Sequence, residues 1–227
     1  MVQPIPLFFV QNECMQVVIL CSAAQRQELG IAPEPVNFVE TIADLLLHQE
    51  AQVWIDLLFD DHRDAHLQVL EQAGETTIVI NAVAQTLAGL PANVVRINAW
   101  PTFLHSALIE GCGSDEHHRE QAAAAFRQFE KTIEWVPDVP GMVSARVIAA
   151  IINEAYFTLL EGIASRQDID TAMKLGTAYP YGPFEWAQKI GMHRIAGLLQ
   201  ALAKTESRYE PCTLLEKESL AHGADSR

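Results

Sequence analysis

The stretch Trp135-Val136-Pro137-Asp138-Val139-Pro140-Gly141 contains two prolines and a glycine, and it divides the chain into halves of different pattern. Prolines and glycines interrupt both helices and strands, so this stretch is a natural domain boundary. Before it, short apolar runs alternate with helical stretches, whereas the pattern after it is wholly helical. We therefore predict two domains, residues 1–137 and residues 138–227.

The first half contains runs of β-branched and aromatic residues that have the length of strands. Continuous apolar runs of this kind are typical of parallel strands that are buried on both faces. Helical stretches separate several of them, and this alternation predicts βαβ units and an α/β domain with a parallel sheet. The predicted strands are Pro6–Val10, Gln16–Leu20, Gln52–Leu58, Thr77–Asn81 and Asn93–Ile97, and the predicted helices are Val36–His48, Asp61–Ala73 and Asp115–Lys131, the last with Ser114 as its N-cap.

The second half predicts an all-α domain. A broad apolar stripe runs along residues 144–163, which indicates a mostly buried helix. Ser165 with Asp168 three residues later is the pattern of a capped helix start. Pro183 suits the first turn of another helix that ends at Gly191, and a last helix over residues 192–204 precedes a polar tail.

The composition excludes several classes of partner. Among 227 residues, 29 are Asp or Glu and 15 are Lys or Arg, for a net charge of −14. This charge disfavours binding to nucleic acid or to an anionic membrane surface. The apolar runs are too short to cross a bilayer. The four cysteines are widely spaced and form no ligand pair, which predicts reduced thiols in a cytoplasmic protein and no metal site: Cys14, Cys21, Cys112 and Cys212.

Several unusual motifs follow one another in the second half. They are Asp138-Val139-Pro140-Gly141-Met142-Val143-Ser144-Ala145-Arg146, Ile152-Asn153-Glu154-Ala155, the stretch from Ile163 to Gly176, and Tyr179-Pro180-Tyr181-Gly182-Pro183-Phe184-Glu185-Trp186-Ala187. In this order they resemble the C-terminal helical domain of the bacterial 3-hydroxyacyl-CoA dehydrogenases. The resemblance implies a Rossmann-like NAD domain before a helical domain that pairs two subunits. It also implies oxidation of the 3-hydroxyl group of an acyl-CoA, with hydride passing to NAD.

The resemblance also assigns site residues. The family's glutamate corresponds to Glu110, and the catalytic histidine twelve residues earlier corresponds to Asn98. Asparagine takes up no proton at neutral pH, so general-base catalysis at that position is lost. An asparagine that contacts the reacting carbonyl in the family corresponds to Ala145, and the family's Ser/Thr-rich loop keeps one hydroxyl, at Thr86.

The first half lacks the glycine-rich turn that a dinucleotide needs, because no GxGxxG occurs in the chain. With Pro6–Val10 as the first strand, Gln11–Met15 replaces the phosphate-binding turn and its helix, and Glu13 adds a negative charge there. The ribose-binding acid at the end of the second strand then corresponds to Cys21. We therefore expect a truncated Rossmann-like domain in which NAD binding is weak or absent.

Other candidate residues have structural alternatives. His105 is a displaced base or a partly buried structural histidine, and His62 with His66 is a metal-capable pair or an exposed helix face. The pair His117-His118 is expected on the surface. Arg146 is a contact for a CoA phosphate or part of a structural ion pair. An aromatic cluster lines an acyl pocket or packs around a turn: Tyr179, Tyr181, Phe184 and Trp186.

Three hypotheses follow. The chain is a family member with impaired chemistry that keeps an acyl-CoA-binding or dimerisation role, an active NAD-dependent dehydrogenase with an unusual site, or an interaction protein that pairs with an active paralogue. The strong helical-domain motifs beside a depleted first half favour the first and third. Because residues 144–163 and 192–203 are very apolar, we also expect a homodimer through the helical domain.

Overall fold

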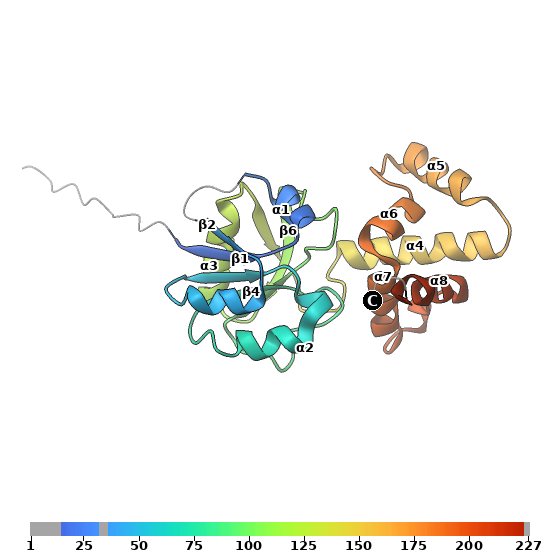
Figure 1. Cartoon of the computed structure of the whole chain (residues 1–227). Helices are drawn as coiled ribbons and strands as arrows, with labels where there is room; N and C mark the ends of the chain where they lie inside the picture. Colours follow the sequence, from blue (N-terminus) through green and yellow to red (C-terminus); the bar gives the residue numbers. More distant parts are fainter. Residues whose placement is uncertain (1–14, 32–35, 225–227) are drawn as a thin grey trace, which may run out of the picture.

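The computed structural model describes residues 15–31 and 36–224, and this part of the chain forms a sheet with flanking helices followed by a bundle of helices (Figure 1). The predicted strand Pro6–Val10 lies outside the described residues, as does the predicted turn Gln11–Met15 except for its last residue. Among the described residues, no helix combines the length and the apolar character needed to span a membrane.

The described strands form one sheet in the order β2-β1-β3-β4-β5-β6-β7. Neighbouring strands are parallel, except that β5 and β6 are antiparallel. Every residue of β1, β3, β4 and β5 is buried, which confirms the predicted α/β domain with a mainly parallel sheet. The strands are β1 (Val17–Leu20), β2 (Val36–Val39), β3 (Val53–Asp56), β4 (Thr77–Asn81), β5 (Val94–Ile97), β6 (Leu108–Gly113) and β7 (Thr132–Trp135).

Helices cover both faces of this sheet. On one face, Leu29 of α1 and Phe126 of α3 join the apolar cluster of the strands. On the other face, Leu45 of the 3-10 helix η1 and Phe59 of α2 do the same. The apolar side chains of the strands are therefore shielded from water on both sides. The bounds are α1 (Ala23–Leu29), η1 (Ile42–Leu47), α2 (Phe59–Leu70) and α3 (Glu116–Arg127).

Three details of the sequence prediction are wrong. The helix predicted over 36–48 is instead β2 followed by η1, because the β-branched and aromatic residues of β2 pair with β1 and extend the sheet. The N-cap of α3 is Asp115 rather than Ser114, since the Asp115 carboxylate accepts a hydrogen bond from the His118 N–H at 3.2 Å. The polar tail after Lys204 contains a further helix, α8.

The second part is all helical, as predicted, and several helix boundaries follow the sequence signals. The Ser165 hydroxyl accepts the Asp168 N–H at 3.2 Å at the start of α5. Pro183 lies in the first turn of α6, and Gly191 ends that helix. The elements are α4 (Ser144–Leu160), α5 (Arg166–Thr177), α6 (Pro183–Ile190), α7 (Met192–Ala203), η2 (Ser207–Tyr209) and α8 (Thr213–Ala224).

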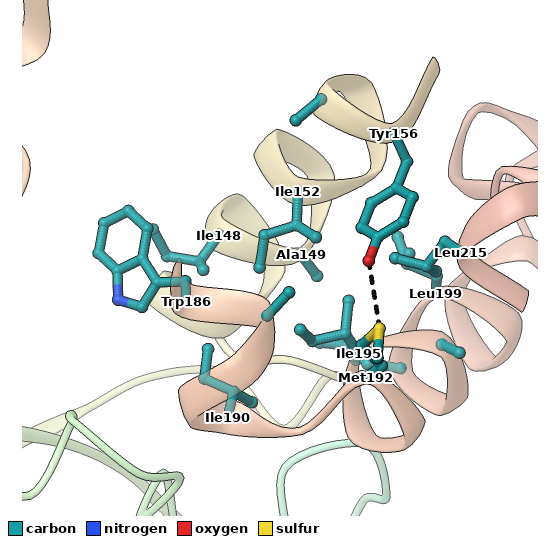
Figure 2. Close-up of a cluster of buried hydrophobic side chains, with 14 of the residues drawn as sticks. Ile148, Ala149, Ile152, Tyr156, Trp186, Ile190, Met192, Ile195, Leu199 and Leu215 are labelled. Atoms are coloured by element: carbon teal, nitrogen blue, oxygen red, sulfur yellow. Dashed lines mark hydrogen bonds between the residues drawn. The ribbon is translucent and has the colours of Figure 1, made fainter. Parts of the chain in front are cut away.

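The helical part has its own apolar core, in which α4, α6, α7 and α8 meet (Figure 2). Ile152 and Tyr156 of α4 lie against Ile195 of α7 and Leu215 of α8 in a cluster of fully or almost fully buried side chains. Each such side chain contributes about 1.5–3 kcal/mol to folding. The Tyr156 hydroxyl keeps a polar partner at this core, because it donates to the Glu218 carboxylate at 3.0 Å, and it also contacts the Met192 sulfur at 3.1 Å.

The two parts are joined by a buried arginine. Arg96 of β5 is fully buried, and its guanidinium pairs with the Asp138 carboxylate at 2.5 Å. The same guanidinium donates to the carbonyl oxygens of Ala82 at 2.9 Å and Val139 at 2.7 Å. Because its charge is both paired and hydrogen-bonded, Arg96 fixes the link between β7 and α4 against the end of the sheet.

Gly182, just before α6, provides a test of this packing. A Cβ atom there would collide with the side chain of Asp170, which accepts the Phe184 N–H at 2.8 Å. We expect Gly182→Ala to lower the free energy of unfolding by about 1–3 kcal/mol in urea denaturation. Gly176 is the control, because a Cβ atom in that helix meets open space and Gly176→Ala should be neutral or stabilising by up to about 1 kcal/mol. Equal effects of the two substitutions would contradict this account.

Candidate functional site

A pocket of about 210 Å³ lies where the end of β5, the strand β6 and the start of α4 meet. Asn98 directly follows β5, Glu110 lies on β6 and Ser144 is the first residue of α4. Because β5 and β6 are antiparallel, Asn98 and Glu110 are neighbours, and the Asn98 N–H donates to the Glu110 carbonyl at 3.0 Å. The other lining residues are Phe103, Ser106, Leu108 and Ile109.

The Glu110 carboxylate binds the N-terminus of α4. It accepts the backbone N–H of Ser144 at 2.9 Å and that of Val143 at 3.3 Å. It also accepts the Ser144 hydroxyl at 2.9 Å. The first N–H groups of a helix lack partners within the helix, and the positive end of the helix dipole favours a carboxylate there. Glu110 therefore attaches the helical part to the sheet.

The Asn98 side chain also bonds across this junction. Its amide donates to the Ser144 hydroxyl oxygen at 3.1 Å, and its carbonyl oxygen accepts the Trp100 N–H at 3.4 Å. The Ser144 hydroxyl thus lies between an amide donor and a carboxylate acceptor. Ser144 was not among the site residues expected from the sequence. The sequence feature that could have indicated it is a hydroxyl next to Ala145, at the start of a helix that follows Pro140-Gly141.

The other two residues suggested by the resemblance, Ala145 and Thr86, take no part in these hydrogen bonds. Ala145 is fully buried in the core of the helical part and carries no hydrogen-bonding group. Thr86 lies in the loop after β4, where its hydroxyl accepts the Ala88 N–H at 3.4 Å, and it is not among the residues lining the pocket. Of the four residues, the structure brings Asn98 and Glu110 together in the pocket.

Comparison with known proteins identifies the second half of the chain. Residues 141–223 match the family model for the C-terminal domain of 3-hydroxyacyl-CoA dehydrogenase. This part of the chain is therefore similar to the C-terminal domain of the 3-hydroxyacyl-CoA dehydrogenases. The sequence of 3-hydroxyadipyl-CoA dehydrogenase from Escherichia coli K12 is 49% identical over 97 residues, which are 42% of this chain and 20% of that protein. A 3-hydroxybutyryl-CoA dehydrogenase from Bradyrhizobium diazoefficiens is 36% identical over 123 residues, 53% of this chain and 42% of that protein. The chain thus spans less than half the length of these two relatives.

Solved structures extend the similarity to most of the described fold. The crystal structure of (S)-3-hydroxybutyryl-CoA dehydrogenase from Ralstonia eutropha superposes with a TM-score of 0.70 at 20% identity, and covers 92% of this chain and 94% of that chain. The 3-hydroxybutyryl-CoA dehydrogenase from Escherichia coli gives a TM-score of 0.59 at 34% identity, over 65% of this chain and 32% of that chain. The Rossmann-like sheet followed by a helical domain is therefore the architecture of this dehydrogenase family.

The order of the first strands differs from the order expected from the sequence. The segment Val17–Leu20 is followed by the helix α1 and then by the parallel strand β2, so it is the first strand of a βαβ unit. The chain then crosses from β2 to β3 on the other side of β1, which makes β1 the switch point of the sheet. Cys21 therefore lies in the turn between the switch-point strand β1 and α1, where dinucleotide-binding folds have their glycine-rich turn, and not at the end of the second strand of the unit. The expectation for Cys21 rested on Pro6–Val10 as the first strand.

The residue that follows β2 is Glu40, and sequence reasoning missed it. An acid about twenty residues after the phosphate-binding turn is the one that bonds the ribose in dinucleotide-binding folds. Glu40 is exposed at this place. The signal was present in the sequence, but the assignment of residues 36–48 to a helix concealed it.

The turn between β1 and α1 is closed by its own side chains. The Ser22 hydroxyl accepts the Gln25 N–H at 3.2 Å, and the Gln25 side chain accepts the Ser22 N–H at 3.0 Å. This capping box uses two of the N–H groups at the start of α1. Burial raises the pKa of the Cys21 thiol to about 11, against the opposing effect of Arg26, so the thiol is neutral.

The histidines lie elsewhere, and three expectations about them are wrong. His105 is exposed instead of partly buried, and it lines a different hollow beside Lys131. His66 is buried and bonds the Asp56 carboxylate at 2.6 Å, because α2 packs its inner face on the sheet. His118 is also buried and bonds the Thr77 hydroxyl at 2.7 Å. Within the described residues, no group of three or more His, Cys, Asp or Glu side chains could hold a metal ion.

The remaining candidates make structural contacts. Arg146 donates to the Pro140 carbonyl at 3.2 Å and lies over the Tyr209 ring. Phe184 and Trp186 are buried in the helical core, where Tyr179 packs edge-on against Trp186. These contacts account for the arginine and the aromatic cluster as parts of the packing.

Two adjacent carboxylates at the start of α2 connect the sheet to the helical domain, and their pKa values move in opposite directions. Burial raises the pKa of Asp60 to about 6, although Asp60 accepts the Val83 N–H at 3.3 Å and the Trp100 indole N–H at 3.1 Å. Both of these residues belong to the apolar core of the helical domain. His193 and Arg194 of α7 hold the pKa of Asp61 at about 2.

The raised pKa of Asp60 predicts a dependence of stability on pH. A carboxyl group whose pKa rises from 3.8 to about 6 on folding binds its proton more tightly in the folded state, so stability increases as the pH falls through this window. From about pH 7.5 to about pH 5, the wild type should gain about 1 kcal/mol of unfolding free energy relative to Asp60→Asn.

Urea denaturation of both proteins at the two pH values measures this gain. Asp64→Asn is the control, because Asp64 is exposed on the same helix and should behave as the wild type does. If Asp60→Asn and the wild type changed stability equally with pH, the account of Asp60 would be wrong.

Proposed function

We propose that this protein binds an acyl-CoA in the pocket between β5, β6 and α4, and that it has lost the NAD-dependent hydride transfer of its family. The observation that carries the proposal is the amide of Asn98, which is hydrogen-bonded to Ser144 at the position where the resemblance implies the family's catalytic histidine. An amide neither accepts nor releases a proton near neutral pH, so the 3-hydroxyl group of a substrate has no general base at this position.

The surroundings of Asn98 support the loss of this step. The resemblance implies that, in the 3-hydroxyacyl-CoA dehydrogenases, the glutamate orients the catalytic histidine and stabilises its charge. Here the Glu110 carboxylate accepts donors from Val143 and Ser144 instead. None of the histidines among the described residues lines the pocket.

The turn after β1 does not fit a dinucleotide. A pyrophosphate needs glycines that let the backbone approach it, together with free N–H groups at a helix start. Cys21 and Ala23 carry Cβ atoms where the motif has none, and the first glycine of the chain is Gly30. The mutual bonds of Ser22 and Gln25 occupy two of the N–H groups. We therefore propose that NAD binds weakly or not at all, and we derive no step through it.

The pocket keeps features that suit a short acyl chain. Its lining combines the apolar side chains of Phe103, Leu108 and Ile109 with the polar side chains of Asn98, Ser106, Glu110 and Ser144. The relatives are named for 3-hydroxybutyryl-CoA and 3-hydroxyadipyl-CoA, which carry short chains on the same thioester. Free thiols at Cys21, Cys112 and Cys212 support a cytoplasmic location.

Titration with acetoacetyl-CoA and with NADH tests this proposal. We expect acetoacetyl-CoA to raise the melting temperature, NADH to leave it unchanged, and the mixture to show no oxidation of NADH at 340 nm, the ordinary absorbance wavelength of that cofactor. Asn98→Leu should weaken the response to acetoacetyl-CoA, whereas Ser114→Ala, at an exposed turn, should not.

Two outcomes would contradict the proposal. Oxidation of NADH by the wild type would contradict the proposal and favour an active dehydrogenase with an unusual site. Absence of a response to acetoacetyl-CoA would also contradict it and favour a protein that acts through its contacts with a partner.

A second part of the proposal is a homodimer through the helical domain. Apolar side chains are exposed along α4 and just after it, including Val147 at 48%, Leu160 at 53% and Ile163 at 68%. Exposed apolar side chains that gather on one element can mark interaction sites in soluble proteins. A second copy of the chain would cover these side chains. A paralogue with the same helical domain would be an alternative partner.

Sedimentation at micromolar concentration should therefore show a dimer for the wild type. A charge at an exposed apolar position of α4, as in Val147→Glu or Leu160→Glu, should shift the protein toward monomer because desolvating a carboxylate opposes association. Leu47→Glu is the control, since Leu47 is exposed apolar surface on the sheet domain. A stable wild-type monomer would contradict the dimer.

A further inference from the structure

We propose that Ser144 is a nucleophile, that Glu110 accepts its proton, and that the site hydrolyses short acyl thioesters. This inference rests on the proposed function, because it requires an acyl-CoA in the pocket. It replaces the lost hydride chemistry with acyl transfer at the same place. The residues are Ser144, Glu110 and Asn98, which meet at the junction of α4 with the sheet.

The geometry of Ser144 and Glu110 is that of a nucleophile beside its base. The Ser144 hydroxyl donates to the Glu110 carboxylate at 2.9 Å, within the range at which a base activates a hydroxyl. The carboxylate is itself oriented by the backbone N–H groups of Val143 and Ser144, at 3.3 and 2.9 Å. Nucleophile, base and orienting groups are therefore all present.

The position of Ser144 in the fold favours negative charge on its oxygen. It is the first residue of α4, a helix of 17 residues, so the positive end of the helix dipole lies beside the hydroxyl. The side chain lines the pocket, which allows a bound carbonyl carbon to approach it.

Asn98 supplies a donor for the oxygen of the attacked carbonyl. Its amide nitrogen lies 3.1 Å from the Ser144 hydroxyl oxygen and carries two N–H groups. One of them bonds Ser144, and in the proposed reaction the other donates to the oxygen that develops charge next to Ser144. A side-chain amide in this role stabilises tetrahedral intermediates in acyl transfer. Asparagine thus serves the proposed reaction, although it cannot serve as the general base of a dehydrogenase.

The reaction balances with water as the only co-reactant. The Ser144 proton passes to Glu110 while Oγ bonds to the thioester carbon. The carbon–sulfur bond then breaks, and the leaving sulfur takes the proton from Glu110 and departs as the CoA thiol. Water attacks the resulting ester and gives a proton to Glu110. The carboxylic acid leaves when the Ser144 oxygen regains that proton, so no electron acceptor or donor is needed.

The rate should be low. A carboxylate is in general a weaker base than the imidazole of a histidine, so the proton transfer from Ser144 is slow. We therefore expect slow turnover, which makes the covalent intermediate a suitable species to observe.

The test uses the full chain with butyryl-CoA and follows release of the CoA thiol with a thiol-reactive dye. We expect release above the rate without protein, and its loss in Ser144→Ala. Glu110→Gln should lower the rate about a hundredfold, the smaller end of the usual contribution of a general base. Ser114→Ala removes an exposed hydroxyl elsewhere and should not change the rate.

Intact mass spectrometry gives an independent readout. Ser144→Cys provides a thiol nucleophile and should gain the mass of one butyryl group, whereas Ser144→Ala should gain none. Ser144→Ala keeps the backbone N–H bonds to Glu110, so a melting temperature close to that of the wild type will show that it folds.

Different outcomes of these experiments would exclude the hydrolysis and the acyl-CoA binding. If butyryl-CoA raised the melting temperature but no thiol release depended on Ser144, the hydrolysis would be excluded and acyl-CoA binding would stand. If butyryl-CoA produced neither a shift nor thiol release, acyl-CoA binding and hydrolysis would both be excluded. Equal thiol release by the wild type and Ser144→Ala would overturn the role of Ser144.

Discussion

The buried guanidinium of Arg96 is the interaction on which the junction of the two domains depends. It pairs with Asp138 and donates to the carbonyl oxygens of Ala82 and Val139, so it binds the loop after β4 and the link to α4 at the same time. Asp138 extends this contact by accepting the Leu87 N–H at 3.0 Å. A charge buried in this way is stable only while all its partners are in place, and this requirement fixes the direction in which α4 leaves the sheet.

The direction in which α4 leaves the sheet also forms the candidate site. Once α4 begins at the edge of the sheet, Ser144 faces Glu110 and Asn98, and the carboxylate binds the free N–H groups of the helix. The same residues therefore connect the domains and line the pocket. At the other end of the junction, Asp60 and Asp61 contact core residues of the helical domain and Arg194 of α7. The polar groups between the domains thus hold them together, and Asn98, Glu110 and Ser144 also line the pocket.

The fold and the chemistry depend on different residues of this chain. The helical part carries motifs that resemble those of the 3-hydroxyacyl-CoA dehydrogenases, and the whole fold superposes on a solved member, whereas the turn after β1 and the end of β5 carry Cys21 and Asn98. A fold establishes where a ligand can lie, while the side chains decide which reaction can occur. The assignment of function therefore depends on the contacts of Asn98, Ser144 and Glu110 more than on the shape of the molecule.

The sequence by itself determined the division into an α/β half and a helical half, most of the helices, and the positions of Asn98 and Glu110. These features depend on local apolar patterns and on motifs, which the chain carries directly. The tertiary structure decided that residues 36–39 form a strand, that Cys21 follows the switch-point strand, and that His66 and His118 are buried. It alone placed the Ser144 hydroxyl between an amide and a carboxylate. Pairing between distant strands and helices decides these points, and no local pattern specifies such a partner.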